Sequence, residues 1–128
     1  MERLNIDSGT PWEEAVGYSR AVRVGPHVFV TGTIAAGEDG RIVSPDAGEQ
    51  AKFIFQKIQA TLERAGARLE HVVRTRIYLL TLDDSDSVGA VHHELFSDIR
   101  PCTTMLAISD LFTDEARVEI EVDAVIHN

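Results

Sequence analysis

The 128-residue chain is poor in basic residues and in cysteine, and each shortage excludes a class of protein. Lys and Arg number 12 against 21 Asp and Glu, the formal net charge is −9, and the basic residues form no cluster. Because phosphates attract basic patches, we expect no nucleic-acid partner. The single cysteine, Cys102, cannot form an internal disulfide. This favours a cytoplasmic protein.

Long hydrophobic runs are also absent. The longest apolar stretches are only a few residues long, whereas a membrane-spanning helix needs about 20, so we expect no membrane partner. The stretch 1–14 has neither the basic start nor the apolar segment of a signal peptide. Its polar composition predicts an N-terminal arm or loop. We predict one domain over residues 1–128, with 1–14 as its arm.

The histidines do not form a metal-binding pattern. His92 and His93 are adjacent in a predicted helix, about 100° apart around its axis, so they cannot easily share one ion. Helical zinc-binding pairs are instead four residues apart. The other histidines are scattered, and no glycine-rich phosphate loop or nucleotide fingerprint is present. We therefore expect neither a metal ion nor a cofactor.

The chain does contain a regular succession of strand and helix patterns. Alternating apolar residues predict five strands, at about 18–25, 27–34, 71–80, 103–108 and 117–126. Apolar residues at helical spacing predict helices over 46–65 and 84–96. Asp46 suits the start of the first helix and Gly66 its end. The order β-β-α-β-α-β-β predicts an α+β domain, a mixed sheet with two helices on one face.

Two of the predicted strands have one apolar face and one charged face. In 117–126 the apolar residues alternate with Glu119, Glu121 and Asp123. In 71–80 the alternation assigns one face to Val73, Thr75, Ile77 and Leu79, and the other to Arg74, Arg76 and Tyr78. Two helices cover only one face of a sheet, so the charged side chains must line the other. A solvated face, a subunit interface, a metal site or a catalytic acid would each explain this pattern.

Three segments resemble the RidA (YjgF) family, formerly called the L-PSP endoribonuclease family. They are "GYSRAVRVGPHVFVTGTIA", "AGARLEHVVRTRIYL" and "RPCTTM…RVEIEVDAV", and the likeness runs from about Ser8 to Ile126. The resemblance implies a chorismate-mutase-like fold. It also implies a homotrimer whose sheets face the threefold axis, with a small-molecule cleft at each subunit interface. The founding members of this family hydrolyse enamine and imine intermediates such as 2-aminoacrylate to 2-keto acids and ammonia.

The same resemblance implies functional residues in this chain. Tyr18 matches the family's site tyrosine, and Gly32 matches the glycine whose backbone N–H lies in the cleft. Thr31 stands where active members have a small hydroxyl residue. Glu119 matches the glutamate that positions or activates water, and is therefore the expected catalytic residue. On this resemblance, the charged face is a subunit interface.

One position departs from the family pattern. Members that act as deaminases have an arginine two residues after the proline of "RPCTTM", where it binds the substrate carboxylate, and this chain has Thr103. Thr103 and its neighbour Thr104 are expected to bind substrate if Glu119 lies across from them. A hydroxyl cannot replace the two charge-assisted hydrogen bonds of a guanidinium. Arg100 could replace it only through an unusual loop. The family's helix asparagine is also replaced, by Gly89.

Two classes of function remain open. The first is a hydrolase or deaminase of imines, enamines or related carbonyl–nitrogen metabolites, without the typical activity on 2-aminoacrylate. The second is a non-catalytic trimer that binds a small metabolite in the same clefts or a partner protein on its surface. The acidic charge disfavours ribonuclease activity.

Overall fold

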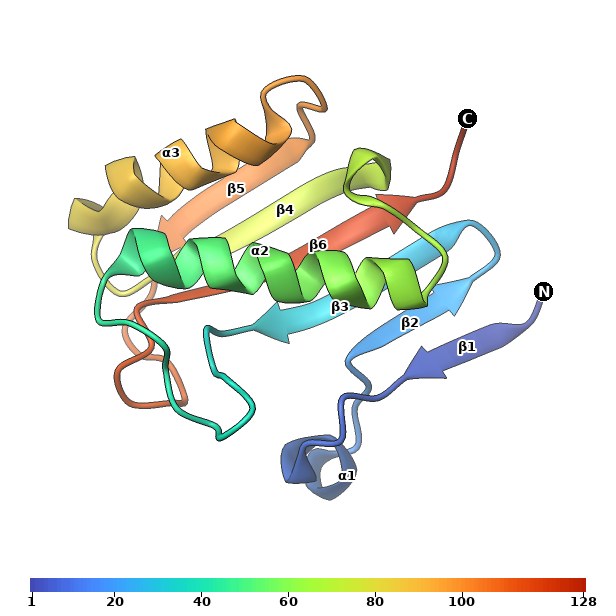
Figure 1. Cartoon of the computed structure of the whole chain (residues 1–128), viewed down its shortest axis with the longest axis horizontal. Coiled ribbons are helices and arrows are strands. Elements are labelled where there is room, and N and C mark those ends of the chain that lie inside the picture. Colours follow the sequence, from blue (N-terminus) through green and yellow to red (C-terminus); the bar gives the residue numbers. More distant parts are fainter.

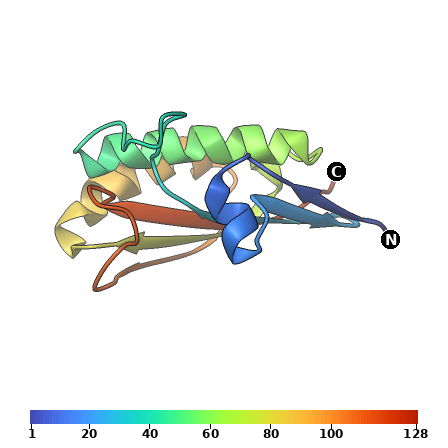
Figure 2. The same cartoon turned by 90° about the horizontal axis from the view of Figure 1, so that it is seen from below.

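The computed structural model describes residues 1–128 as a six-stranded mixed sheet with two long helices on one face (Figures 1 and 2). The strands are β1 (Arg3–Ile6), β2 (Ala21–Val24), β3 (His27–Thr33), β4 (Val72–Leu79), β5 (Cys102–Ala107) and β6 (Val118–Val125). The helices are α1 (Pro11–Val16), α2 (Ala47–Arg64) and α3 (Ser85–Phe96), with 3₁₀ turns η1 (Leu69–His71) and η2 (Leu82–Asp84). The strand order is β1-β2-β3-β6-β4-β5, and only β4 and β5 are parallel. The predicted α+β class is confirmed.

Helix α2 begins and ends at its predicted capping residues. The Asp46 carboxylate accepts a hydrogen bond from the Glu49 N–H at 2.8 Å, and Gly66 follows the helix with a φ of +85°. Glycine adopts this left-handed conformation without steric cost, so the chain can turn back toward the sheet there. The buried stripe of α2 packs on β3, β6 and α3. No helix of the chain combines the length and apolar character needed to cross a membrane.

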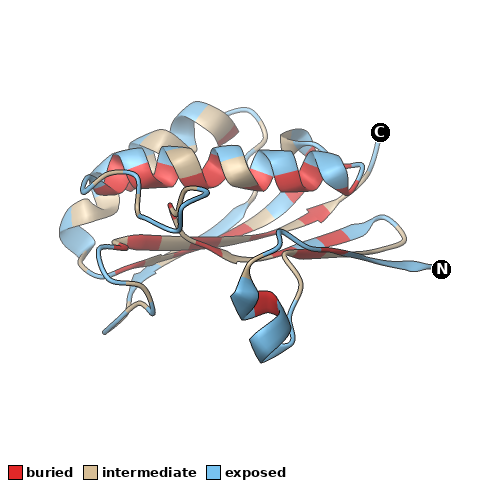
Figure 3. Cartoon of the chain, turned by 60° about the horizontal axis from the view of Figure 1, so that its bottom comes forward, coloured by how far each residue is buried: buried red, intermediate tan, exposed pale blue.

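Strand β6 lies in the middle of the sheet, between β3 and β4 and beneath α2 (Figure 1). Buried segments of the sheet lie beneath the long helix that carries a row of buried residues (Figure 3). Val118, Ile120 and Val122 have 0% exposure. The acidic residues that alternate with them are only partly buried, as expected for side chains on the other face. The alternation read from the sequence therefore describes the two faces of this strand correctly.

The stretch 1–14, predicted as an arm or loop, contains two short elements. Strand β1 pairs antiparallel with β2 and extends the sheet, with Ile6 only 5% exposed. Helix α1 has Pro11 at its start, where the fixed φ of proline suits a helix, and Glu13 and Glu14 in its first turn. Four residues of strand and six of helix are too short for their periodicity to stand out. The observed order therefore adds a strand and a helix before the predicted β-β-α-β-α-β-β.

Strand β4 departs from the predicted alternation at one residue. The alternation predicts Val73 on the buried face, but Val73 is 40% exposed and Val72 only 3% exposed. The pairing of β4 with β6 shifts register between Val72 and Arg74, and this bulge displaces Val73 from the buried row. From Thr75 onward the predicted alternation is correct.

The sheet face opposite α2 and α3, called here the open face, is largely uncovered in one chain (Figure 2). Charges on this face pair across strands β4 and β6. Asp123 lies 3.2 Å from Arg76 and 3.8 Å from Arg74, measured from carboxylate oxygen to guanidinium nitrogen. The Tyr78 hydroxyl donates a hydrogen bond to the Glu121 carboxylate, and this bond raises the pKa of Tyr78. The open face is thus an ordered array of paired charges.

Candidate functional site

Gly32 of β3 and Glu119 of β6 lie against each other at one end of the open face. Between Val30 and Thr33 the pairing of β3 with β6 shifts, because β3 contains one more residue than the facing part of β6. This β-bulge brings the Gly32 backbone under the Glu119 carboxylate. A Cβ atom at position 32 would overlap that carboxylate, so glycine is what allows it to rest on the backbone.

The surroundings of Glu119 raise its pKa above the ordinary value for a glutamate. Burial is the largest cause, and the negative charge of Glu121 on the same face adds to it. The positive charge of Arg20 acts in the opposite direction. A carboxyl group with a raised pKa accepts a proton more readily than an ordinary carboxylate and can return that proton later in a reaction. Glu119 is therefore the group on the open face that best suits acid–base chemistry.

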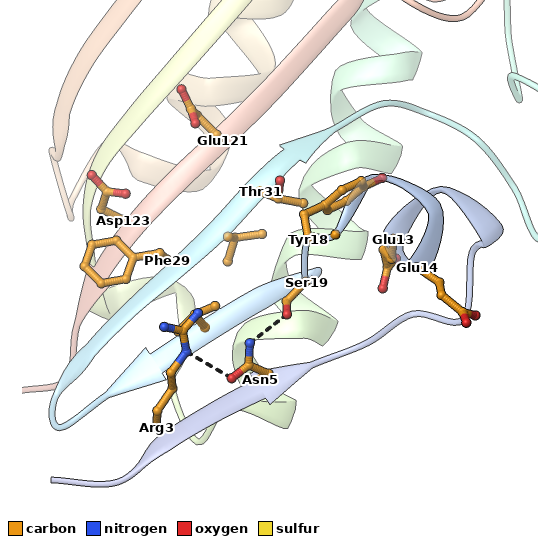
Figure 4. Close-up of a pocket in the computed structure, with 13 residues that line it drawn as sticks. Arg3, Asn5, Glu13, Glu14, Tyr18, Ser19, Phe29, Thr31, Glu121 and Asp123 are labelled. Carbon is orange, nitrogen blue, oxygen red and sulfur yellow. Dashed lines mark hydrogen bonds between the residues drawn. The ribbon is translucent and has the colours of Figure 1, made fainter.

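Tyr18 and Thr31 line a cavity of about 650 Å³ (Figure 4). Gly32 and Glu119 are not in its lining, but their neighbours Thr31 and Glu121 are. The cavity lies between α1 and the ends of β1, β2 and β3, and Glu121 and Asp123 of β6 border it. Tyr18 is held in place by its N–H, which donates to the Glu13 carbonyl at 2.9 Å. Four of the predicted site residues, Tyr18, Thr31, Gly32 and Glu119, therefore occupy one region of the open face.

Thr103 and Thr104 lie elsewhere, on the edge strand β5. Thr103 pairs with the buried Thr75 of β4, and their hydroxyl oxygens are 2.8 Å apart. His92 Nε2 of α3 lies 2.9 Å from the Thr75 hydroxyl and 3.3 Å from that of Thr103. Thr103 therefore faces α3, whereas Thr104 pairs with Arg76 and faces the open side. Within one chain, Thr103 and Glu119 are on opposite faces of the sheet.

A second cavity, of about 490 Å³, lies between α3 and the residues just before β5. Its lining includes Gly89, His92 and Arg100. Arg100 has a φ of +55°, which residues with side chains rarely adopt. The loop before β5 therefore contains one residue in the left-handed conformation. The chain contains no group of three or more His, Cys, Asp or Glu that could hold a metal ion.

Arg20 and Glu13, which the sequence did not point to, also contact this region. Arg20 Nη1 lies 3.3 Å from the Gly32 carbonyl, and its Nη2 lies 3.6 Å from the Glu13 carboxylate. Glu13 is only 5% exposed. The only signal in the sequence that could have suggested Arg20 and Glu13 is that one basic and one acidic residue lie within a few positions of Tyr18. Such pairs are common on protein surfaces, so the signal is weak.

Comparison with known proteins matches the chain to one family. The family model for Endoribonuclease L-PSP matches residues 10–126. An uncharacterised protein of Streptomyces coelicolor is 39% identical over 119 residues, which cover 93% of this chain and 89% of that protein. A 2-iminobutanoate/2-iminopropanoate deaminase of Dermatophagoides farinae is 30% identical over 110 residues, 85% of each chain.

A solved structure agrees with this match. Rv2704 of Mycobacterium tuberculosis, described as a member of the YjgF/YER057c/UK114 family, is 42% identical to this chain. The two structures superpose with a TM-score of 0.89 over 98% of this chain and 100% of that one. The chain therefore belongs to the endoribonuclease L-PSP family, which is the RidA (YjgF) family that its sequence resembles.

Proposed function

We propose that this protein hydrolyses imines, enamines or related carbonyl–nitrogen compounds, with Glu119 as the group that activates water. The observation that carries the proposal is the Glu119 carboxyl, which has a raised pKa and rests on the Gly32 backbone, next to Thr31 in the lining of an open cavity. The Dermatophagoides relative is named for a reaction of this class. Membership of the family and the chemistry of Glu119 thus favour the same reaction.

The proposed reaction uses one carboxyl group for two proton transfers. Ionised Glu119 accepts a proton from water while the water oxygen bonds to the carbon of a protonated C=N group, whose π electrons pass to the nitrogen, so that a neutral tetrahedral carbinolamine forms. Glu119 then returns its proton to the nitrogen. The C–N bond breaks as the hydroxyl oxygen forms C=O, and the hydroxyl proton passes to the released ammonia, so a carbonyl compound and ammonium leave. A carboxyl group with a raised pKa suits both steps, because its ionised form is a stronger proton acceptor than an ordinary carboxylate. Backbone N–H groups near Gly32 would stabilise the charge that develops during the reaction.

We further propose that the complete site is shared between chains of a homotrimer. Thr103, at the position of the family's substrate-binding arginine, cannot meet Glu119 of its own chain because the sheet separates them. Strand β5 is an edge strand, and Leu106 on it is 40% exposed. Phe29 on the open face is 49% exposed. Apolar side chains on an open edge and an open face favour association with further copies of the chain.

Sedimentation equilibrium of the purified protein at neutral pH tests this assembly. We expect about three chains per particle at micromolar concentration, because the family resemblance implies a homotrimer and the proposed cleft needs residues from two neighbouring chains. A stable monomer at that concentration would contradict the shared site. It would leave Glu119 and Thr103 in separate regions of one chain.

The residue at position 103 indicates the class of substrate. No guanidinium stands there, and the Thr103 hydroxyl already lies within hydrogen-bond distance of Thr75 and His92. Burial lowers the pKa of His92, which favours its neutral imidazole form. This part of the cleft therefore offers neutral hydrogen-bonding groups. We propose substrates that do not depend on a bound carboxylate.

Two imines prepared in solution test the proposal. An amine oxidase produces uncharged imines from primary amines, and an amino-acid oxidase produces imines that carry a carboxylate. Semicarbazide captures either imine as an absorbing semicarbazone, so a hydrolase lowers the rate at which this product accumulates. We expect the protein to lower that rate for the uncharged imine, and Glu119→Gln to restore the rate measured without protein. An equal effect of wild type and Glu119→Gln would contradict a role for this carboxylate.

The occupied Thr103 hydroxyl also favours a second candidate, a non-catalytic trimer that binds a neutral metabolite in the same cleft. In that case neither imine would be hydrolysed faster than in buffer. A small-molecule library soaked into crystals would then locate a ligand in the cleft with no chemical change to it.

A further inference from the structure

We infer that Arg20, held by Glu13, is a positioning residue for Glu119. It fixes the bulged backbone on which the Glu119 carboxyl rests, and it supplies the positive charge that this carboxyl faces. The functional meaning of the inference rests on the proposed role of Glu119, whereas its structural part does not.

The guanidinium of Arg20 holds the bulge of β3 from within the chain. Its Nη1 donates to the Gly32 carbonyl at 3.3 Å and lies at the same distance from the Thr33 hydroxyl. That hydroxyl donates its own proton to the Thr31 carbonyl at 2.8 Å, so toward Arg20 it acts as an acceptor. The backbone N–H of Thr31 donates to the Arg20 carbonyl at 3.1 Å. Every residue of the bulge is therefore tied to Arg20, directly or through Thr33.

Glu13 in turn holds Arg20. Its carboxylate accepts hydrogen bonds from the Ser8 N–H at 2.9 Å, the Thr10 hydroxyl at 3.0 Å and the Ser8 hydroxyl, and it lies 3.6 Å from Arg20 Nη2. Burial alone would raise the pKa of Glu13, but these hydrogen bonds and the charge of Arg20 lower it. Glu13 therefore stays ionised. A buried carboxylate that accepts this many hydrogen bonds has a fixed position, so its ion pair with Arg20 also fixes the position of the guanidinium.

The arrangement determines two properties of Glu119. The first is its place, because the carboxyl lies where a Cβ of residue 32 would be and follows any shift of that backbone. The second is its charge balance. Glu121 on β6 opposes ionisation of Glu119, Tyr78 on β4 donates to Glu121, and Arg20 favours ionisation.

Lys57 of α2 also lies within range of Arg20, since both burial and the charge of Arg20 lower its pKa. The Lys57 ammonium binds the backbone instead: it donates hydrogen bonds to the carbonyls of Ile34 and Ala36 at 3.1 and 3.0 Å. Arg20 is therefore the positive group that acts on Glu119, and Lys57 is part of the support of the loop that follows β3.

The sign of the effect follows from these charges. Removal of the Arg20 charge leaves burial and Glu121 unopposed, so the pKa of Glu119 must rise further. If ionised Glu119 activates water, kcat/KM increases with pH through this pKa. Loss of Arg20 therefore moves the inflection of the rate profile to higher pH. A residue that only attached α1 to the sheet would change stability but not this inflection.

A carbon-13 NMR titration of the glutamate carboxyl signals tests the inference, with the Glu119 signal assigned from its loss in Glu119→Gln. We expect Arg20→Gln to raise the Glu119 midpoint by about half a pH unit or more. The control Arg64→Gln, which removes an exposed arginine of α2 on the other side of the sheet, should leave the midpoint unchanged. An unchanged midpoint in folded Arg20→Gln would overturn the inference.

Two further variants separate charge from geometry. Arg20→Lys keeps the positive charge but loses the planar guanidinium and its several N–H donors. We expect the pH–rate profile to keep an inflection close to that of wild type, with kcat/KM reduced about tenfold. Full activity of Arg20→Lys would overturn the positioning role, and this variant serves if Arg20→Gln fails to fold. Glu13→Gln should free the Arg20 guanidinium to rotate, so we expect its Nη nitrogen-15 NMR signals to merge into one average signal. Separate Nη signals in Glu13→Gln would overturn the role of Glu13 in holding Arg20.

The NMR and kinetic readouts distinguish this inference from the proposed function. A shifted Glu119 midpoint in Arg20→Gln, with no imine hydrolysis by any variant, would support the arrangement of Arg20 and Glu119 and contradict the hydrolase. Imine hydrolysis that depends on Glu119, with an unchanged midpoint and an unchanged pH profile in Arg20→Gln, would support the hydrolase and contradict the role of Arg20.

Discussion

Thr103→Arg is expected to raise hydrolysis of 2-aminoacrylate and related imino acids by on the order of a hundredfold in kcat/KM. An arginine makes two charge-assisted hydrogen bonds to a carboxylate in a fixed orientation, whereas the threonine hydroxyl offers one neutral bond. The family resemblance implies a carboxylate-binding arginine at this position, so the change would introduce that interaction. The measurement is the steady-state rate of 2-keto acid formation by wild type and by Thr103→Arg, with an arginine-bearing relative assayed alongside.

The strand geometry offers a matched control for this variant. Thr104 is the next residue of β5 and faces the other side of the sheet, so Thr104→Arg adds the same charge in a different place. We expect no comparable gain from it. Glu119→Gln on the Thr103→Arg background should remove the gain, because the water-activating group is then absent. Strong native activity that matches the relative would instead mean that another group, with Arg100 as the first candidate, binds the carboxylate.

The second large effect concerns stability. Ile120 has no exposed surface and lies at the centre of β6 beneath α2. Ile120→Ala is expected to lower the free energy of unfolding by about 2–5 kcal/mol, because it leaves a cavity in a packed core. Denaturant unfolding at equal protein concentration measures this change, since association of chains makes the apparent stability depend on concentration.

Val73→Ala is the matched control. Val73 is also an apolar strand residue, but it is displaced by the β4 bulge and 40% exposed. We expect a loss of about 1 kcal/mol or less. A loss below about half a kcal/mol for Ile120→Ala would indicate that the two faces of β6 are exchanged, since a slip of one residue moves every side chain to the other face.

These variants differ in how far the sequence alone could have suggested them. The burial of Ile120 follows from the alternation in 117–126, and the ends of α2 follow from Asp46 and Gly66, because strand and helix periods and capping residues act within a few neighbours. The exposure of Val73 does not follow, because the bulge that displaces it depends on pairing with β6. Strand β1 and helix α1 are too short to have a clear period of their own.

The candidate site shows the same division. Resemblance to the family indicated Glu119 and Gly32. The contact between them arises from the bulge in β3, which the local sequence of β3 does not predict. Arg20 and Glu13 were missed because their role depends on partners from Ser8 to Thr33. An arginine or a glutamate on a short surface segment is most often solvated. Only the burial of Glu13 and the contacts of Arg20 therefore distinguish these two residues.

The sequence by itself determined the acidic charge, the α+β class, the two faces of β6 and the threonine at position 103. Each of these follows from composition, from local periodicity or from a match of consecutive residues. The tertiary structure alone decided that Thr103 and Glu119 lie on opposite faces of the sheet, and that Arg20 holds the bulge beneath the Glu119 carboxyl. The physical reason is that such contacts join residues from separate strands, and strand order, bulges and pairing register form only when the whole sheet assembles.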